Sequence, residues 1–413
     1  MSSHHLSVER VVLLASLIGV CVSPLSGQTI TYDAVSVDDG DRAPLVVIGT
    51  RVPTGSRHDM AGLEGTAWML GKTLAAQTNA ALGPEAEVTV YVGRSSTLFV
   101  LSALPSAWPI AWETLERTLF EATLDSTSFE QEWSTLERQL LFQRGSPGLD
   151  SELRSVQLIA PDSSPWARPT SGTPESLAAL TVRDLEFLRL TEYSIGTSVV
   201  AAVGLDDNPV LRDHPSGRTT PPPDGPTSPP DGPAWTVGSR LSVTEEITSS
   251  WVSVAYPLRG PLPRTALEFV AHVIRWRLDP RPPDPDRYSI EVRLVDAPLG
   301  TVIVIDAAVA PGASERFEQE VLRIVSSLTE EPLEGDFFRW ERRRFLAAQL
   351  LTGADPEVAV ARITSDLMRD GEPRDLAADI WDITPDVVAH ALGALGEPQI
   401  FRLGPDLASG GSR

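Results

Sequence analysis

Apolar and polar residues alternate in two stretches of the chain, and each stretch predicts a β-hairpin. In the first, apolar positions alternate over 88–92 and resume over 98–100 after a Gly-Arg-Ser-Ser turn. The second stretch repeats this pattern over 290–294 and 302–304. Strand periodicity on both sides of a short polar turn is typical of a hairpin. One hairpin is therefore expected in each half of the chain.

Helical patterns flank the two hairpins in the same order. An apolar helix is expected before each hairpin and two amphipathic helices after it. Further along, each half ends in a short apolar strand that stops at Gly204 or Gly404. The predicted helices cover 62–74, 112–123 and 129–142 in the first half and 265–278, 314–328 and 337–351 in the second. Unless generic elements coincide by chance, this repeat predicts an α+β fold of two similar halves, each a mostly antiparallel sheet covered by helices.

A proline-rich segment separates the two halves. At 413 residues, the chain is too long for one ordinary hydrophobic core. Residues 208–233 are rich in Pro, Gly, Ser and Asp. Because proline fixes φ and lacks an N–H donor, this segment predicts a semi-rigid linker rather than a helix or a strand. The N-terminal and C-terminal halves are then expected to span 28–207 and 234–413.

The N-terminus has the layout of a secretory signal. Residues Val11–Val22 form an uninterrupted apolar run that is followed by small residues. The run is shorter than the roughly 20 residues that span a bilayer, which disfavours the alternative of a membrane anchor. We expect 1–27 to be a signal peptide and the mature protein to be periplasmic or extracellular. Cleavage there also removes Cys21, the only cysteine, and with it any disulfide or thiolate site.

Net charge and histidine spacing exclude several classes of function. Lys and Arg total 34 against 56 Asp and Glu, a net charge of -22, which disfavours nucleic acid and anionic membranes as partners. No two histidines share the i, i+4 spacing of a helical zinc site. The candidates outside the signal are His58, His214, His272 and His390. Motif chemistry alone therefore describes a non-catalytic, exported protein of two domains.

Three blocks of the first half carry a family resemblance. They are Val52–Asp59 with the Gly62-Leu63 pair, the segment from Thr78 through the first hairpin, and 172–193. Together they resemble the insulinase-like (pitrilysin-type) zinc metallopeptidases, and the similarity extends over roughly 45–404. This resemblance implies two duplicated α+β halves that close like a clamshell around a peptide. It therefore agrees with the internal repeat.

The resemblance breaks down at the metal site. Active members of the family carry H-x-x-E-H shortly after the Gly-Leu pair, and the two histidines bind the zinc ion. In this chain Gly65, Trp68 and Met69 stand at the His, Glu and His positions. Glu137 lies in the helix that carries the family's third ligand, but a lone carboxylate cannot hold zinc. We therefore expect no metal or cofactor in this chain, and Trp68 and Met69 are expected to pack on the helix.

The second half retains a pair of residues that the resemblance associates with the substrate. Active members carry an Arg and, seven residues later, a Tyr that reach the substrate carbonyl and the developing oxyanion. Arg281 and Tyr288 have this spacing, and both side chains donate hydrogen bonds to an oxygen that gains negative charge. Three prolines between them depart from the family pattern, so a chance match is the alternative. Arg287 falls outside this register and is expected to contribute much less.

Two functions from different classes fit these observations. In paired bacterial members of the family, one chain carries the zinc motif and the other donates Arg and Tyr. This sequence resembles the second kind, which implies a zinc-bearing paralogous partner and a peptide substrate. The alternative is a catalytically inactive peptide-binding or scaffold protein with the same fold. An autonomous hydrolase of another mechanism has little support from the motifs.

Overall fold

The computed structural model describes most of the chain between residues 45 and 405. The described residues are 29–32, 45–143, 160, 164–205, 239–260, 262–279, 284–297, 300–331 and 333–405. The expected signal peptide and the whole of the expected linker lie outside them.

Two five-stranded sheets with the same strand order form the framework. The N-terminal sheet has the order β1-β5-β2-β4-β3 and the C-terminal sheet the order β6-β10-β7-β9-β8. In each sheet only the first pair is parallel, β1 with β5 and β6 with β10, and the other neighbours are antiparallel. The strands are β1 Thr29–Tyr32, β2 Val46–Val52, β3 Ala86–Val92, β4 Thr97–Ala103, β5 Val199–Val203, β6 Arg240–Thr244, β7 Ser250–Pro257, β8 Arg287–Ala297, β9 Gly300–Val309 and β10 Gln399–Gly404.

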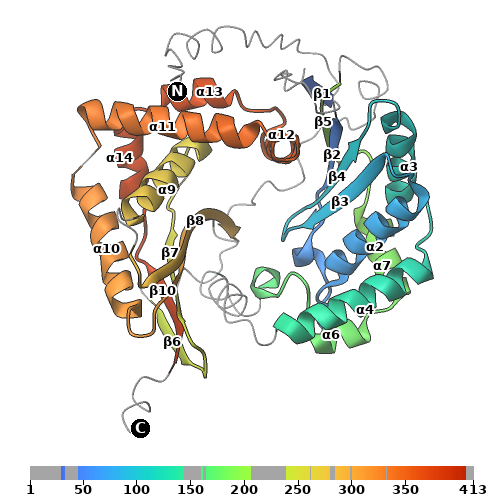
Figure 1. Ribbon diagram of the computed structural model, residues 1–413, viewed down its shortest axis with the longest axis horizontal. Helices are drawn as coiled ribbons and strands as arrows, with labels where there is room; N and C mark the ends of the chain where they lie inside the picture. Colours follow the sequence, from blue (N-terminus) through green and yellow to red (C-terminus); the bar gives the residue numbers. More distant parts are fainter. Residues whose placement is uncertain are drawn as a thin grey trace, which may run out of the picture.

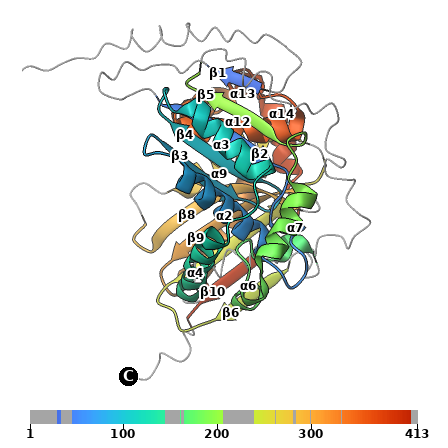
Figure 2. The ribbon, with the colours of Figure 1, turned by 90° about the vertical axis from the view of Figure 1, so that its right-hand side faces the viewer.

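Helices cover the outer face of each sheet, so that the two sheets lie toward the middle of the molecule (Figures 1 and 2). The N-terminal half contributes α2 Thr66–Ala81, α3 Trp108–Phe120, α4 Ser126–Gln143, α6 Pro174–Ala179 and α7 Val182–Glu192, with short 3-10 turns η1 Ser56–His58 and η2 Pro165–Ala167. The C-terminal half contributes α9 Arg264–Leu278, α10 Ser314–Glu330, α11 Gly335–Gly353, α12 Pro356–Asp370, α13 Leu376–Asp382 and α14 Pro385–Gly393.

Each half has its own hydrophobic core between its sheet and its helices. In the N-terminal half, Ile48 and Phe99 of the sheet pack with Leu70 of α2. In the C-terminal half, Ile305 and Phe269 occupy the corresponding layer. Burying side chains of this size stabilises the fold by about 1.5–3 kcal/mol each. The predicted α+β fold of two similar halves is therefore confirmed.

One helix crosses from the C-terminal half to the N-terminal sheet. The buried side chains of Val360 and Ile363 on α12 pack on the face of that sheet that its own helices leave uncovered. Gly49 of β2 permits this approach, because a Cβ there would lie only 3.0 Å from the Cβ of Val360. The guanidinium of Arg51 donates a hydrogen bond of 2.9 Å to the carbonyl of Ala361. The two halves are thus joined by packing as well as by the chain.

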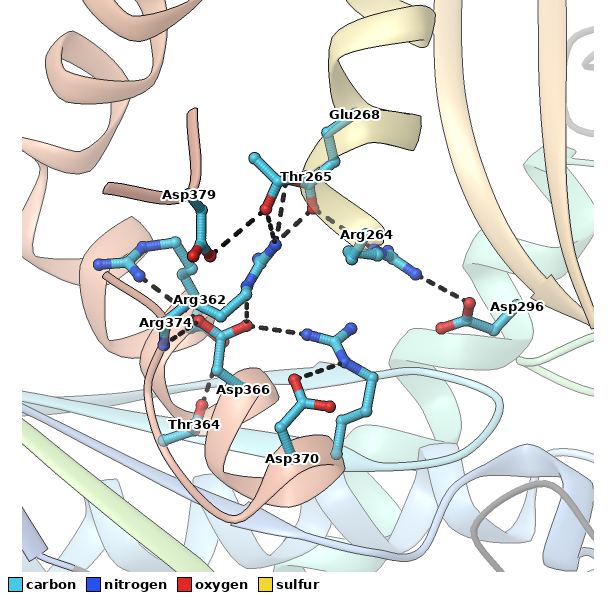
Figure 3. Close-up of polar contacts among 12 residues, drawn as sticks. Arg264, Thr265, Glu268, Asp296, Arg362, Thr364, Asp366, Asp370, Arg374 and Asp379 are labelled. Atoms are coloured by element: carbon cyan, nitrogen blue, oxygen red, sulfur yellow. Dashed lines mark hydrogen bonds and ion pairs between the residues drawn. The ribbon is translucent and has the colours of Figure 1, made fainter. Parts of the chain in front are cut away.

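A buried carboxylate fixes α12 to its own half. Asp366, which is 0% exposed, accepts hydrogen bonds from Arg374 Nε at 2.9 Å and Arg369 Nη2 at 2.8 Å, and Arg362 Nη1 lies 3.4 Å away. Arg374 also reaches Glu268 of α9 at 3.3 Å (Figure 3). Buried charges are tolerated only when they are paired and hydrogen-bonded. This network therefore holds α12 against α9 while the other side of α12 covers the N-terminal sheet.

Candidate functional site

The start of α2 is where the resemblance places the zinc ligands, and a glycine backbone occupies it. Gly65 precedes the helix with φ of 93°, and its carbonyl accepts a hydrogen bond of 2.9 Å from the Met69 N–H. A Cβ at Gly65 would lie 2.7 Å from the carbonyl oxygen of Ser171. A side chain at this position would be strained by the left-handed φ, and it would clash with the Ser171 carbonyl oxygen, which belongs to the backbone and cannot rotate away. The position therefore does not accommodate an imidazole.

The segment from the end of η2 into α6 closes on this helix start. The guanidinium of Arg168 donates a hydrogen bond of 2.8 Å to the carbonyl of Asp59, and the hydroxyl of Ser176 donates one of 2.8 Å to the carbonyl of Glu64. Gly172 passes so close that a Cβ there would lie 2.2 Å from the same Glu64 oxygen. Two chain segments thus meet backbone to backbone where a metal site would require space.

Asp59 caps the start of α2, a role that the sequence analysis missed. One carboxylate oxygen accepts the Gly65 N–H and the other the Ala67 N–H, both at 2.8 Å. The side chain is buried, and this burial raises the pKa of Asp59 to about 7, although the two N–H donors favour the charged form. The usual capping rule could not find it, because that rule concerns the residue immediately before the helix, which is Gly65, and Asp59 lies six residues earlier.

The other residues of the expected zinc motif contribute to packing. Met69 is 0% exposed and belongs to the N-terminal core. Trp68 is half-buried against the same core, and Lys72 Nζ lies 5.3 Å from its ring centroid. Both residues thus pack as the sequence predicted. Glu137 lies on α4 with its side chain exposed.

The residues present at this site do not fit a zinc ion. Gly65, Trp68 and Met69 supply no imidazole or carboxylate. Among the described residues, no group of three or more His, Cys, Asp and Glu side chains could hold a metal. His58 uses Nδ1 in a hydrogen bond with the Gly55 N–H at 3.0 Å, and His272 lies 3.9 Å from a carboxylate oxygen of Glu341.

Tyr288 lies at the start of β8, the edge strand of the C-terminal sheet. The register between β8 and β9 shifts at this point, so that Arg287 pairs with Val309 and Ser289 with Ala308. Tyr288 is thus the extra residue of a β-bulge, and 59% of it is exposed. Bulges commonly re-aim a side chain away from the sheet. Its expected companion Arg281 falls outside the described residues, so the structure does not place the two relative to each other.

Arg287, the neighbour of Tyr288 that falls outside the family spacing, is held in contacts within the C-terminal half. Its side chain is only 7% exposed and forms an ion pair with Glu320 of α10. It also donates a hydrogen bond to the carbonyl of Leu278, and its guanidinium carbon lies 5.0 Å from the ring centroid of Phe317. Arg287 therefore anchors β8 to α9 and α10. A variant at this position would disturb packing and cannot serve as an inert control.

Comparisons with known proteins identify the fold. The sequence matches no family model and no curated protein. A peptidase M16 inactive domain from Pseudomonas fluorescens superposes with a TM-score of 0.74 at 14% identity, covering 93% of this chain and 97% of that chain. An M16-like peptidase from Alicyclobacillus acidocaldarius gives 0.69 at 15% identity, with 88% and 94% covered. The periplasmic protease PqqL from Escherichia coli gives 0.66 at 12% identity, with 92% of this chain and 44% of that chain covered.

These similarities define the class of fold. The chain has the clamshell arrangement of insulinase-like M16 peptidases, with two similar halves. At such low identity the likeness concerns the fold alone, and activity has to be argued from the site. In the part of the chain that the structure describes, no helix is long and apolar enough to cross a membrane.

Proposed function

We propose that this chain is the non-metal-binding subunit of an exported insulinase-like metallopeptidase, whose zinc ion is held by a paralogous partner chain. The observation that carries this proposal is the closed start of α2. A peptidase fold whose metal position is filled by backbone has no means to activate water through zinc by itself. Catalysis by this protein would therefore require a second chain that contains the metal.

Tyr288 and Arg281 are proposed to act on the substrate in the partner's site. A phenol and a guanidinium both donate hydrogen bonds to the oxygen that becomes negative when a peptide carbonyl is attacked. The exposure of Tyr288 on a bulge of an edge strand is consistent with contact to another molecule. Such donors act in the transition state more than on the bound substrate, so their loss should lower kcat more than it raises KM.

The experiment is peptide cleavage by the pair formed with an exported, zinc-bearing paralogue from the same host. Tyr288→Phe and Arg281→Ala should each lower kcat on the order of 10²–10³, the usual cost of removing one oxyanion donor. Complex formation and zinc content of the pair should not change. Both should be measured on the same samples by size-exclusion chromatography and elemental analysis.

The structure offers matched controls for both substitutions. Tyr91 lies on β3, the edge strand of the other sheet, and is 52% exposed. Its hydroxyl donates only a long hydrogen bond of 3.4 Å to Glu357, so Tyr91→Phe serves as the control for loss of an exposed phenol hydroxyl. Arg323→Ala removes an exposed guanidinium from α10. Neither control should change kcat. Cleavage at the wild-type rate by the Tyr288 and Arg281 variants would refute their role.

A scaffold or peptide-binding function is the second candidate. It is favoured by the same closed helix start and by the structural likeness to an inactive domain. This candidate predicts that the chain binds peptides, or braces a complex, without any effect on a partner's turnover. If the chain fails to associate with every zinc-bearing paralogue exported by its host, this second function is the better one.

Export is proposed from the apolar run over 11–22 and its small-residue tail. The shared fold of a periplasmic protease is compatible with this location. The intact mass of protein isolated from its native host tests it. A mature chain should lack about the first two dozen residues, in keeping with the usual length of secretory signals.

A further inference from the structure

The helical layer of the C-terminal half presents aromatic rings and guanidinium groups together on its surface. Trp276 lies near the end of α9, and Phe337 and Trp340 lie in the first turns of α11. The ring centroid of Trp276 is 5.6 Å from that of Trp340 and 6.0 Å from that of Phe337. Trp340 is 50% exposed. With Arg277 and Arg344, these rings form what we call the arginine–tryptophan patch.

Both arginines of the patch are stacked on the rings. The guanidinium carbon of Arg277 lies 4.8 Å from the centroid of Phe337, and that of Arg344 lies 4.8 Å from Trp276 and 5.3 Å from Trp340. Stacking on an aromatic face holds a guanidinium in place while its edge remains able to donate to a carboxylate. The donors are thus positioned before a ligand arrives.

One carboxylate lies beneath the patch and pairs with it only in part. Glu341 is 0% exposed, and its Oε2 lies 3.7 Å from Arg344 Nη1, an ion-pair distance that is too long for a hydrogen bond. Arg344 Nη1 is itself buried and has no hydrogen-bond partner, but 31% of the Arg344 side chain is exposed. Among the residues that the structure describes, no ion pair joins a carboxylate to Arg277, which is exposed. Arg277 and the exposed part of Arg344 are therefore the groups that a partner can meet.

The local charge contrasts with that of the whole chain. The segment 337–345 reads FFRWERRRF, and α9 adds Arg275 and Arg277 close by, in a protein whose net charge is -22. Arg342 is used internally, because it donates to the carbonyls of Trp381 and Ile383 at 2.8 and 3.0 Å. Arg339 forms an ion pair with Asp336. Arg275, Arg277, Arg343 and the partly exposed Arg344 make this surface a basic area on an acidic molecule, and complementarity favours an acidic partner.

We propose that the arginine–tryptophan patch binds an acidic polypeptide segment, whose carboxylates pair with Arg277 and Arg344 and whose apolar side chain rests on Trp340. Trp and Arg are the residues that dominate the binding energy of protein interfaces. A long polyanion such as nucleic acid would also meet the negative remainder of the chain, whereas a short segment engages the patch alone. The patch lies on α9 and α11, not on β8. The proposed peptide binding is therefore independent of the proposed peptidase function.

Fluorescence anisotropy of the full chain with a labelled peptide of repeated Glu-Glu-Leu tests the proposal. A peptide with Gln in place of every Glu is the neutral counterpart. Arg277→Gln and Trp340→Ala should each weaken binding of the acidic peptide about tenfold or more, as expected for interface anchors. Arg343→Gln removes an exposed charge from α11 that is not stacked on the patch, and it should change binding much less. Circular dichroism of each variant controls for folding.

Several outcomes would overturn the proposal. Equal binding of the Glu and Gln peptides would show that carboxylates are not recognised. An equal effect of Arg343→Gln and Arg277→Gln would show general attraction by charge instead of a built site. Tighter binding of a single-stranded oligonucleotide or of vesicles containing anionic lipid, with the same dependence on Arg277, would assign the patch to a different class of partner.

Discussion

The two halves share one strand order and differ at the helix that begins beside their sheets. In the N-terminal half, the start of α2 is closed by glycine backbone and capped by the buried carboxylate of Asp59, which accepts its hydrogen bonds from backbone N–H groups. In the C-terminal half, the start of α9 is held by charges, with Glu268 paired to Arg374 and Arg264. Figure 3 shows how these pairs continue to the buried Asp366. The same framework therefore tolerates either a backbone contact or an ion network at equivalent positions.

This difference bears on what each half can contribute. The N-terminal half offers no space for a zinc-binding side chain at Gly65, because the φ angle of Gly65 and the carbonyl of Ser171 exclude one. The C-terminal half keeps an exposed edge strand with Tyr288 at its bulge. If the protein acts on peptides, its contribution is therefore expected from the second half, and the first half serves as support.

The largest expected effect is the loss of the buried carboxylate on α12. Asp366→Ala would leave the guanidinium of Arg374 without its buried partner and would loosen the helix that covers the N-terminal sheet. Removal of one member of a buried ion network typically costs about 3–5 kcal/mol. Urea unfolding should show this loss. Asp370→Ala, on the same helix and 44% exposed beside Arg369, should cost less than about 1 kcal/mol, as exposed pairs do.

A smaller effect is expected at the closed helix start. Gly65→Ala should destabilise the protein by about 2–3 kcal/mol, because it adds both a left-handed φ strain of about 1–2 kcal/mol and a clash with Ser171. Gly62→Ala is the matched control, since Gly62 has a φ of 84° but no atom within 4 Å of its would-be Cβ. It should therefore show the strain without the clash. Equal losses of stability at the two positions would contradict the account of the closed site.

The same closure predicts that restoring the ligand types does not restore the metal. A triple variant with Gly65→His, Trp68→Glu and Met69→His should be less stable than the wild type and should bind no stoichiometric zinc. Elemental analysis after dialysis against a weak chelator measures this directly. One retained zinc ion per chain would show that the loop containing Ser171 can open.

Much of the fold was predictable from the sequence because its helices and strands follow from the local spacing of apolar residues. The hairpins and the helices around them produced clear patterns, and the repeat gave the two similar halves. The predicted helix over 62–74 begins only at Thr66, because Gly65 adopts a left-handed conformation that no periodicity reveals. The crossing of α12 to the other half was not predicted. Its Asp355-Pro356 start is a good helix signal, but its partner surface is more than 150 residues away along the chain.

The candidate site was predictable only in part, because contacts between residues that are distant in sequence leave no local pattern. The absence of zinc-ligand residues at Gly65, Trp68 and Met69 was visible in the sequence, whereas the approach of Ser171 to Gly65 depends on tertiary contacts. Arg287 and Tyr288 are neighbours in sequence with opposite environments, one buried and one exposed, because a bulge separates them. The seven-residue spacing between Arg and Tyr could not show that Arg287 anchors β8 whereas Tyr288 is accessible.

A pH dependence of stability is expected from the cap of α2. Burial raises the pKa of Asp59 to about 7 in the folded protein, whereas an unfolded Asp titrates near 3.9. The folded state therefore binds the proton more tightly. The resulting stabilisation is present below about pH 4 and is lost as the pH rises through about 7. Nearby Glu64 raises this pKa further and Arg168 lowers it.

The variant Asp59→Asn isolates the titration of Asp59. Groups that titrate in both proteins cancel in the difference between their free energies of unfolding. The stability of the wild type relative to Asp59→Asn, measured by urea unfolding, should fall between about pH 5 and pH 8 by more than about 1 kcal/mol. At low pH the wild type should be the more stable protein, since an Asn side chain has one acceptor oxygen for the two N–H groups that Asp59 caps. A difference that is constant over this range would mean that Asp59 is already charged near pH 5, and that the two N–H donors outweigh its burial.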